Sequence, residues 1–275
     1  MKPFIMALGM SWILLSTPVQ AQNLGLTLPN SSCSCTTSAQ DSLEEPQSFK
    51  SGKFQGQCID SCRFRPARIL ENQKELTVAN ILHFGSYYKT TLNLQDFEKI
   101  EMGFENFLPG ISHVVLRFTL HGKAPALRLV HQTDTERPPV LVRTLVLSSE
   151  GVPPKDHKYT LLEAYLGNFL LVHRLVTGEE FTRWVAEYKH PSTFLPLIVP
   201  AGKVGKILLK GIQESDQQRL QSVYALFSNN CATSAFRFLD SELPATRNTW
   251  QRLQEALPIA GPLGTQSALR ERKLF

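Results

Sequence analysis

The stretch from Ser112 to Leu120 constrains the fold most strongly, because its sequence, Ser-His-Val-Val-Leu-Arg-Phe-Thr-Leu, is rich in β-branched and aromatic residues. Such a run is typical of a largely buried β-strand. Residues 126–131 and 140–147 have the same character, and His121-Gly122-Lys123 predicts a turn after the first run. Three successive strands with short connections favour an antiparallel meander. We therefore expect an α+β fold with a small antiparallel sheet.

A change from polar to apolar residues predicts a helix near the C-terminal end of the chain. Ser228, Asn229 and Asn230 are favoured N-cap residues, and an apolar helical pattern follows over residues 232–239. Cys231 is therefore expected in or next to the first turn. Further helices are expected over residues 179–188 and from a cap at 215–216 to about Phe227, with a short strand over 204–209.

The expected position of Cys231 suits a reactive thiol. Unpaired backbone N–H groups and the positive end of the helix dipole both favour a thiolate. Backbone N–H groups around the cysteine, at residues such as Asn230 and Ala232, are candidates to hold an oxyanion. The alternative is a small buried cysteine that only packs a helix end.

A thiol nucleophile needs a base, and two histidines are candidates. His113 lies in the apolar run, where an imidazole costs burial energy unless it has a partner or a use. His131 ends the next predicted strand and is a candidate to orient that base, as the third member of a triad does. The alternatives are a satisfied structural histidine at 113 and an exposed strand-end residue at 131.

The N-terminus has the features of a signal peptide over residues 1–21. Lys2 is followed by an apolar run from Phe4 to Leu15 and by Val19-Gln20-Ala21, a site with small residues. The run is too short for an ordinary transmembrane helix. We therefore expect an exported protein, with an uncleaved anchor as the alternative.

The cysteines predict a disulfide-linked segment over residues 22–75, followed by a catalytic domain over residues 76–275. Four cysteines are clustered near the start, and the fifth, Cys231, lies about 170 residues further on. A Cys-x-Cys spacing is too tight for an easy internal bridge, so each cysteine of the first pair is expected to bridge to one cysteine of the second pair. A zinc site is the alternative. The clustered cysteines are Cys33, Cys35, Cys58 and Cys62.

The net charge and the absence of several known motifs narrow the classes of ligand that the sequence supports. The net charge of +5 suits an anionic membrane surface, whereas no basic stripe with interleaved aromatic residues indicates nucleic-acid binding. The sequence contains no HExxH, phosphate-loop, GxGxxG or GxSxG motif, and we predict neither a metal nor a cofactor.

Several segments together resemble one family of exported bacterial thiol proteins. Residues 221–233, which include Ser-Asn-Asn-Cys-Ala-Thr, are similar to its helix, aromatic, Asn-Cys-Thr signature. Residues 110–118 resemble its histidine motif, with Ser112 in place of the glycine before the histidine. Residues 166–169, 184–188 and 62–68 resemble further blocks. This family has a circularly permuted papain-like (NlpC-type) fold and includes the lipoprotein N-acyltransferase Lnb.

The resemblance implies a function as well as a fold. It implies Cys231 as nucleophile and His113 as base, and it leaves the third residue open. The implied enzyme would form an acyl-thioester from a phospholipid and pass the acyl chain to the N-terminal cysteine amine of a diacylated lipoprotein. It would be membrane-associated in the bacterial periplasm. The alternatives are a cell-wall cysteine peptidase or amidase and a non-enzymatic envelope binding protein.

Overall fold

The computed structural model describes residues 33, 43, 47–61, 63–72, 75–108, 111–200, 202–226, 228–243 and 261–275. The chain divides into two compact units, Met1–Ser32 and Cys33–Phe275. The predicted signal peptide lies outside the described residues, and everything that follows concerns the second unit. The predicted boundary between a disulfide-linked segment and a catalytic domain at residues 75 and 76 stays a prediction.

The second unit is built on a large, mostly antiparallel sheet, so the expectation of a small sheet was wrong. Eleven strands of the described residues join in the order β10-β4-β5-β8-β9-β2-β3-β6-β7, with β1 beside β2 and β11 beside β9. The β2–β9 pair is parallel. The strands are β1 (Arg68–Asn72), β2 (Leu76–His83), β3 (Ser86–Leu92), β4 (Phe97–Leu108), β5 (Ile111–Leu120), β6 (Leu127–His131), β7 (Val140–Val142), β8 (Thr144–Val152), β9 (Phe169–Thr177), β10 (Ser192–Pro196) and β11 (Ser222–Tyr224).

The predicted meander does not form, although its strands do. Strand β5 pairs with β4 and β8, whereas β6 pairs with β3 and β7. The chain leaves β5 where the His121 amide binds the Asp96 carbonyl, and it then crosses to β3. Residues 140–147 form two strands separated by Arg143, whose guanidinium binds the carbonyls of His121 and Ala124. A turn pattern in the sequence indicates where the chain reverses direction, but it does not determine which strand pairs with the strand that follows.

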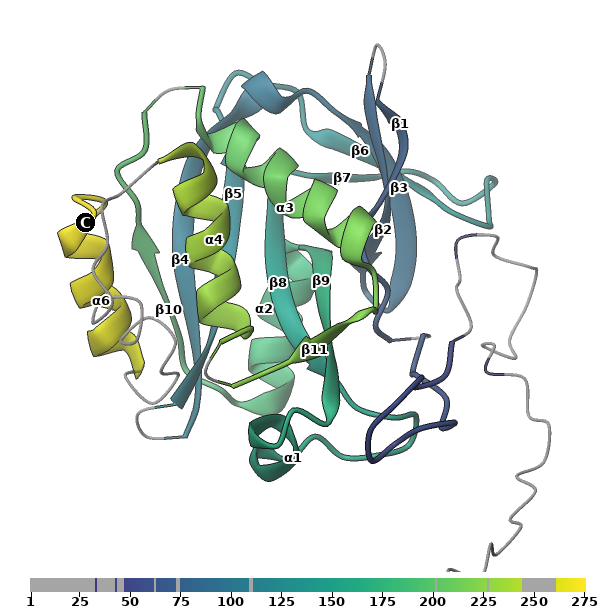
Figure 1. The fold of residues 1–275 in the computed structure, drawn as a ribbon. Coiled ribbons are helices and arrows are strands. Elements are labelled where there is room, and N and C mark those ends of the chain that lie inside the picture. Colours follow the sequence, from purple (N-terminus) through teal and green to yellow (C-terminus); the bar gives the residue numbers. More distant parts are fainter. Residues whose placement is uncertain are drawn as a thin grey trace, which may run out of the picture. The chain divides into compact units, whose positions relative to one another are not determined.

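Helices cover both faces of the sheet (Figure 1). Helices α3 and α4 lie in front of the sheet in this view, and α2 lies behind it. Among the described residues, no helix is both long and apolar enough to cross a membrane. The helices are α1 (Leu161–Tyr165), α2 (Gly178–Tyr188), α3 (Val204–Gln218), α4 (Cys231–Glu242) and α6 (Gly261–Glu271), and η1 (Leu94–Asp96) is a 3₁₀ turn.

The helices predicted over residues 179–188 and from Cys231 are confirmed, whereas the strand and the helix predicted between them were wrong. Helices form at 178–188 and from Cys231, but residues 204–218 are helical and 222–224 form a strand. Val204, Ile207, Leu208 and Ile212 are buried at the spacing of one helix face. The predicted cap residues lie in the last turn of α3, where the Ser215 hydroxyl donates to the His173 carbonyl and Asp216 pairs with Arg68.

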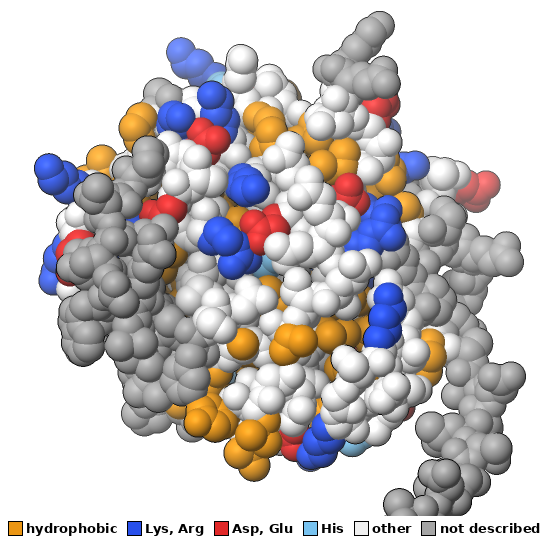
Figure 2. Space-filling model, viewed as in Figure 1, with side chains coloured by type: hydrophobic (Ala, Val, Ile, Leu, Met, Phe, Trp, Pro, Cys, Tyr) orange, Lys and Arg blue, Asp and Glu red, His pale blue; other side chains and the backbone are white. Residues whose placement is uncertain are grey.

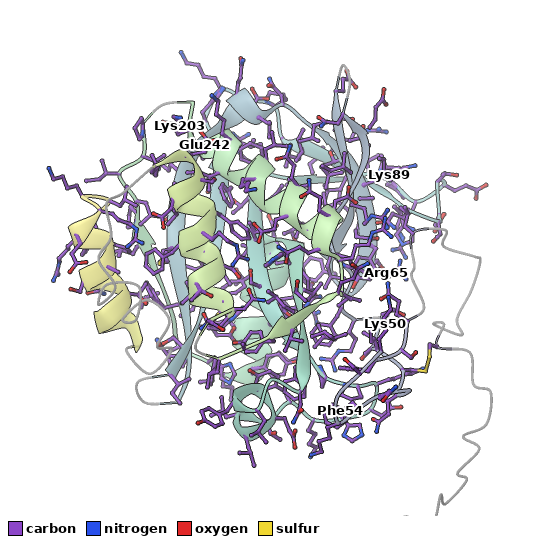
Figure 3. All side chains as sticks on the ribbon, viewed as in Figure 1. Lys50, Phe54, Arg65, Lys89, Lys203 and Glu242 are labelled. Atoms are coloured by element: carbon purple, nitrogen blue, oxygen red, sulfur yellow. A yellow bond between two sulfur atoms is a disulfide. The ribbon has the colours of Figure 1, made fainter. Side chains whose placement is uncertain are left out.

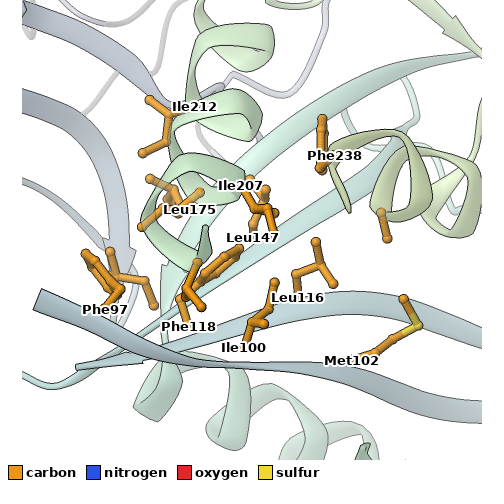
Figure 4. Close-up of a cluster of buried hydrophobic side chains, with 14 of the residues drawn as sticks. Phe97, Ile100, Met102, Leu116, Phe118, Leu147, Leu175, Ile207, Ile212 and Phe238 are labelled. Carbon is orange, nitrogen blue, oxygen red and sulfur yellow. The ribbon is translucent and has the colours of Figure 1, made fainter. Parts of the chain in front are cut away.

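Strand β5 supplies side chains to both faces of the sheet. Val114, Leu116 and Phe118 enter the main core between the sheet and helices α3 and α4 (Figure 4). Val115 enters a separate core with Phe181 of α2. Because side chains alternate along a strand, His113 points to the α2 face.

The segment before β1 is closed by an internal disulfide and is attached to the sheet by aromatic packing. Cys33 bridges to Cys58, which confirms one of the predicted links between the two cysteine pairs and removes both from a zinc site. Phe49, Phe54 and Ile59 pack against the ends of β8 and β9. Cys35 and Cys62 lie outside the described residues. A disulfide favours an oxidising compartment outside the cytoplasm.

Helices α3 and α4 are joined at their outer ends by an ion pair. Lys203 and Glu242 point toward one another in Figure 3, and Lys203 Nζ lies 2.9 Å from Glu242 Oε2. Their inner surfaces are close to the sheet, since a Cβ atom at Gly211 would lie 2.1 Å from Leu147 Cδ2. This glycine therefore sets how closely α3 approaches β8.

We predict that Gly211→Ala lowers the free energy of unfolding by up to about 2 kcal/mol. Alanine gains about 1 kcal/mol of helix propensity. Overpacking costs about 1–3 kcal/mol, and here the added methyl group meets Leu147 in the core. Urea unfolding of both proteins measures the difference. Gly122→Ala is the control, because no atom lies within 4 Å of its Cβ position. Equal losses in the two variants would contradict the packing argument.

Candidate active site

Cys231 and His113 meet at a fork in the sheet. Strands β5 and β8 pair from Thr119 and Thr144 as far as Val115 and Ser148. Beyond that point β5 continues beside β4, and β8 continues beside β9. Helix α4 packs on one face and His113 points to the other, so the two side chains approach from opposite faces and meet where the strands separate.

The start of α4 is fixed by a capping box. The Asn230 side-chain oxygen accepts from the Thr233 amide at 2.9 Å, and the Thr233 hydroxyl accepts from the Asn230 amide at 2.8 Å. Cys231 is the first residue of the helix, as predicted. The Asn230 side-chain nitrogen, Nδ2, donates to the Leu226 carbonyl at 2.6 Å. Asn230 is therefore a cap whose side chain is already committed, whereas the Ala232 N–H donates to the Cys231 sulfur.

The His113 ring connects Cys231 to a buried polar chain. His113 Nε2 lies 2.8 Å from Ser148 Oγ, which leaves Nδ1 for the hydrogen bond with Cys231. The Ser148 hydroxyl donates to Glu150 Oε1 at 2.8 Å, and Arg174 Nη1 donates to Glu150 Oε2 at 2.6 Å. His113 is thus held by a serine hydroxyl, which is itself hydrogen-bonded to a carboxylate that pairs with a guanidinium.

The two reacting groups favour opposite charges. Burial lowers the pKa of His113, but its hydrogen bond with Cys231 and the negative charges of Cys231, Glu150 and Glu105 raise it to about 9. Burial raises the pKa of Cys231, but His113 and the N–H groups of Val114 and Ala232 lower it below its ordinary value. Both shifts favour a thiolate–imidazolium ion pair.

The far end of the polar chain is also held in charged form. Burial raises the pKa of Glu150, but the charges of Arg174 and His113 and a hydrogen bond from Ser148 lower it below its ordinary value. Arg174 is itself nearly inaccessible to solvent, and its guanidinium lies 4.9 Å from the centre of the Trp184 ring.

Two tyrosines lie beside the nucleophile. Tyr224 hydrogen-bonds to both Cys231 and Tyr159, and burial raises its pKa well above the ordinary value, as do those neighbours. A Cβ atom at Gly151 would lie 2.9 Å from Tyr159 Cε2 and 3.3 Å from Tyr224 Cγ. Gly151 therefore makes room for both rings. The Tyr224 hydroxyl is a neutral donor at the reacting atom, as an oxyanion site requires.

A cavity of about 1020 Å³ opens beside these groups. Its walls carry Cys231, His113, Glu150, Tyr159 and Tyr224 together with a mixture of apolar and charged side chains. Cys231 itself is only 4% exposed, so a substrate reaches the sulfur through this cavity. The volume lies at the upper end of ordinary ligand pockets.

The structure does not bring His131 to the site. Strands β8, β9, β2 and β3 lie between β5 and β6 in the sheet. His131 Nδ1 accepts from the Asp134 amide at 3.0 Å, and its ring centre lies 5.1 Å from that of Tyr88. The proposal that His131 orients the base followed from the predicted meander, which does not form. Ser148 takes that place.

The three residues of the polar chain beyond His113 were missed in the sequence, as were the two tyrosines, although a signal was present for each of the three. Ser148 and Glu150 are polar residues at alternate positions at the end of an apolar strand, which places both on one face. Arg174 is a charge inside the apolar strand β9. Buried polar residues at such positions usually have partners, and these three partner one another.

Among the residues described, no group of three His, Cys, Asp or Glu side chains is arranged to hold a metal ion.

A scan of protein-family models and searches of curated proteins and of solved structures find no match to this chain. The geometry of the site and the resemblance of its sequence motifs therefore carry the functional argument.

We predict that His113→Gln slows alkylation of folded Cys231 by iodoacetamide at pH 6.5 by at least about tenfold. Each unit of pKa increase lowers the thiolate fraction tenfold, and without the imidazolium the burial of Cys231 raises its pKa. Peptide mass spectrometry of the Cys231 peptide gives the rate at each pH. In denaturant the two proteins should react equally, whereas equal rates in the folded state would contradict the ion pair.

We also predict that Glu150→Gln lowers the midpoint of His113 titration from about 9, because the Glu150 charge helps to raise that pKa. NMR of protein with isotope-labelled histidine side chains measures this midpoint. Glu180→Gln is the matched control, since Glu180 lines the same cavity but pairs with Arg183. A midpoint that moves equally in both variants would show that Glu150 has no specific influence.

Proposed function

We propose that this protein is a thiol acyltransferase that moves an acyl chain from a phospholipid to the N-terminal cysteine amine of a lipoprotein. The observation that carries the proposal is the Cys231–His113 pair at a large, mixed cavity. A thiolate, a protonated base and nearby N–H and O–H donors are the components of acyl transfer through a thioester. The lipid donor and lipoprotein acceptor follow from the sequence resemblance.

The first half-reaction loads the enzyme. The Cys231 thiolate attacks the ester carbonyl carbon, and the Ala232 N–H and Tyr224 O–H are placed to stabilise the resulting oxyanion. The carbon–oxygen bond then breaks, and His113 gives its proton to the departing alcohol oxygen. The products are an acyl-thioester on Cys231 and a lysophospholipid, and His113 is left neutral.

The second half-reaction transfers the acyl chain to nitrogen. The acceptor amine attacks the thioester carbonyl, and neutral His113 takes a proton from that nitrogen. The carbon–sulfur bond breaks and returns Cys231 to the thiolate. The acceptor leaves as an amide, and the His113 imidazolium is restored.

Apolar side chains at the cavity support a lipid donor. Tyr159 and Leu161 line it, and Leu162, Tyr165 and Leu166 follow as exposed residues on and after α1. Figure 2 shows hydrophobic side chains gathered at the lower edge, over α1 and along β11. A contiguous exposed apolar surface next to a reactive site is typical of a lipid or protein contact. Such a location at the periplasmic face of a membrane agrees with the disulfide and the predicted signal peptide.

Charged residues in the same cavity keep a second function open. Glu180, Glu187, Arg63 and Lys158 line its walls and would suit a peptide substrate. A cysteine peptidase or amidase would use the same pair. The hydrogen bond between Cys231 and His113 weighs against the non-enzymatic alternative, which has no need of an activated thiol.

Intact-mass spectrometry of the purified full chain with phospholipid vesicles tests the proposal. We predict a fatty-acyl adduct that hydroxylamine removes, because hydroxylamine cleaves thioesters. The adduct should be absent from Cys231→Ala and from a sample with denatured protein. It should be retained in Ser234→Ala, the control on the same helix. A rapidly alkylated Cys231 without any adduct would favour the peptidase or amidase instead.

A further inference from the structure

A second pair of titratable side chains, His190 and Glu105, lies in the same cavity as the Cys231–His113 pair. His190 Nδ1 lies 2.6 Å from Glu105 Oε1, and both residues line the cavity. Their side chains are 30% and 14% exposed, respectively. His190 Nε2 makes no hydrogen bond with any described residue, which leaves this nitrogen for a ligand.

Glu105 lies directly beside the base of the proposed reaction. It is the cross-strand partner of His113 in the β4–β5 pair. Such partners project from the same face of a sheet, with their Cβ atoms about 5 Å apart. The Glu105 carboxylate is therefore held next to the imidazole that exchanges protons with the substrate.

The pair is held in place by its surroundings. Glu105 pairs with Ser192 of β10, and the adjacent Asn106 amide binds the Pro191 carbonyl at 2.9 Å. The His190 amide donates to the Val185 carbonyl at 3.0 Å. The His190 ring also stacks at 5.8 Å on Tyr188. Contacts from two strands and one helix thus fix the orientation of the imidazole.

Proton balance shows what such a pair would contribute. An α-amino group has a pKa of about 7.7–8.0, so at pH 7 most of it is ammonium. Conversion of an ammonium into an amide removes two protons from nitrogen. Neutral His113 takes one proton as it returns to imidazolium, and the other needs a second acceptor. Hydrolysis does not need a second proton acceptor. When water attacks the thioester, His113 takes one of its protons and the other stays on the carboxylic acid product.

We propose that Glu105 and His190 form the subsite for the acceptor ammonium, in which His190 Nε2 removes the first proton before attack on the thioester. This inference rests on the proposed acyl transfer and assigns its acceptor site. The Glu105 carboxylate attracts the cation and orients His190 through Nδ1. The first proton passes from the ammonium to Nε2 and leaves a neutral amine beside acyl-Cys231. The second passes to His113 during attack.

Other titratable groups face the same space. On the elements packed against the pair, the titratable side chains that line the cavity are His113 of β5, Cys231 of α4, and Glu180, Arg183, Glu187 and Tyr188 of α2.

The test separates loading of the enzyme from transfer. The full-length protein is loaded from 4-nitrophenyl butyrate, whose acyl group reaches Cys231 without lipid recognition. Decay of the butyryl-thioester is then followed by intact-mass spectrometry with three acceptors. They are a peptide with an N-terminal S-diacylglyceryl cysteine, hydroxylamine, which is largely uncharged at neutral pH, and water.

We expect Glu105→Gln to lower the ratio of the peptide transfer rate to the hydroxylamine rate at least tenfold at pH 7; the ratio is used because the Glu105 charge also raises the pKa of His113. We expect His190→Asn to load normally but to transfer to the peptide amine at least tenfold more slowly at pH 7, as loss of a general base predicts. For His190→Asn, decay with hydroxylamine or water should change less than twofold. At pH 8.5 the acceptor is itself largely neutral, so the defect should shrink severalfold. His157→Asn, which alters another histidine of the cavity wall, should behave as wild type.

Three results would overturn the inference. They are peptide transfer at the wild-type rate in both variants, an equal loss with hydroxylamine, and a defect that persists at pH 8.5. Failure of the proposed function is a different outcome, in which wild-type protein forms no thioester with phospholipid vesicles. The activated ester still measures the acceptor subsite in that case.

Discussion

The structure depends on a buried pair of opposite charges, which the Cys231 thiolate and the His113 imidazolium form. Removing an ion from water costs several kcal/mol, and a buried pair persists only where each charge has good partners. Here Cys231, His113, Glu150 and Arg174 form a buried chain in which the favoured charges alternate in sign. Removal of any one of these four side chains leaves its charged neighbour buried without a partner of opposite charge. This alternation of charge favours the thiolate form of Cys231.

The fork between β5 and β8 makes this arrangement possible. A continuous sheet would separate the layer that carries α4 from the layer that carries α2, and Cys231 would not reach His113. Where the strands part, helix and strand contribute side chains from opposite faces to one point. Gly211 and Gly151 adjust the fit on either side, since the first lets α3 approach Leu147 and the second accommodates two tyrosine rings.

Local features of the structure were predictable from the sequence, and pairing between distant strands was not. The capping residues before Cys231 and the composition of residues 112–120 identified a helix and a strand, because both signals act within a few residues. The partner of β5 depends on a crossover that no turn motif specifies. His131 was consequently assigned to a neighbouring strand, and Ser148 was overlooked because its role depends on register with Val115. The helical spacing of buried residues in 204–212 was present but misread as a strand.

Strand separation also changes the hydrogen bonding of a single backbone group. The Val114 N–H lies in a buried strand, yet it donates to the Cys231 sulfur. Acylation or alkylation removes the negative charge from that sulfur and weakens this bond. The chemical shift and solvent-exchange rate of the Val114 amide therefore report the chemical state of the nucleophile. A backbone resonance in the core thus serves as an internal spectroscopic probe of whether the Cys231 sulfur is free or covalently modified.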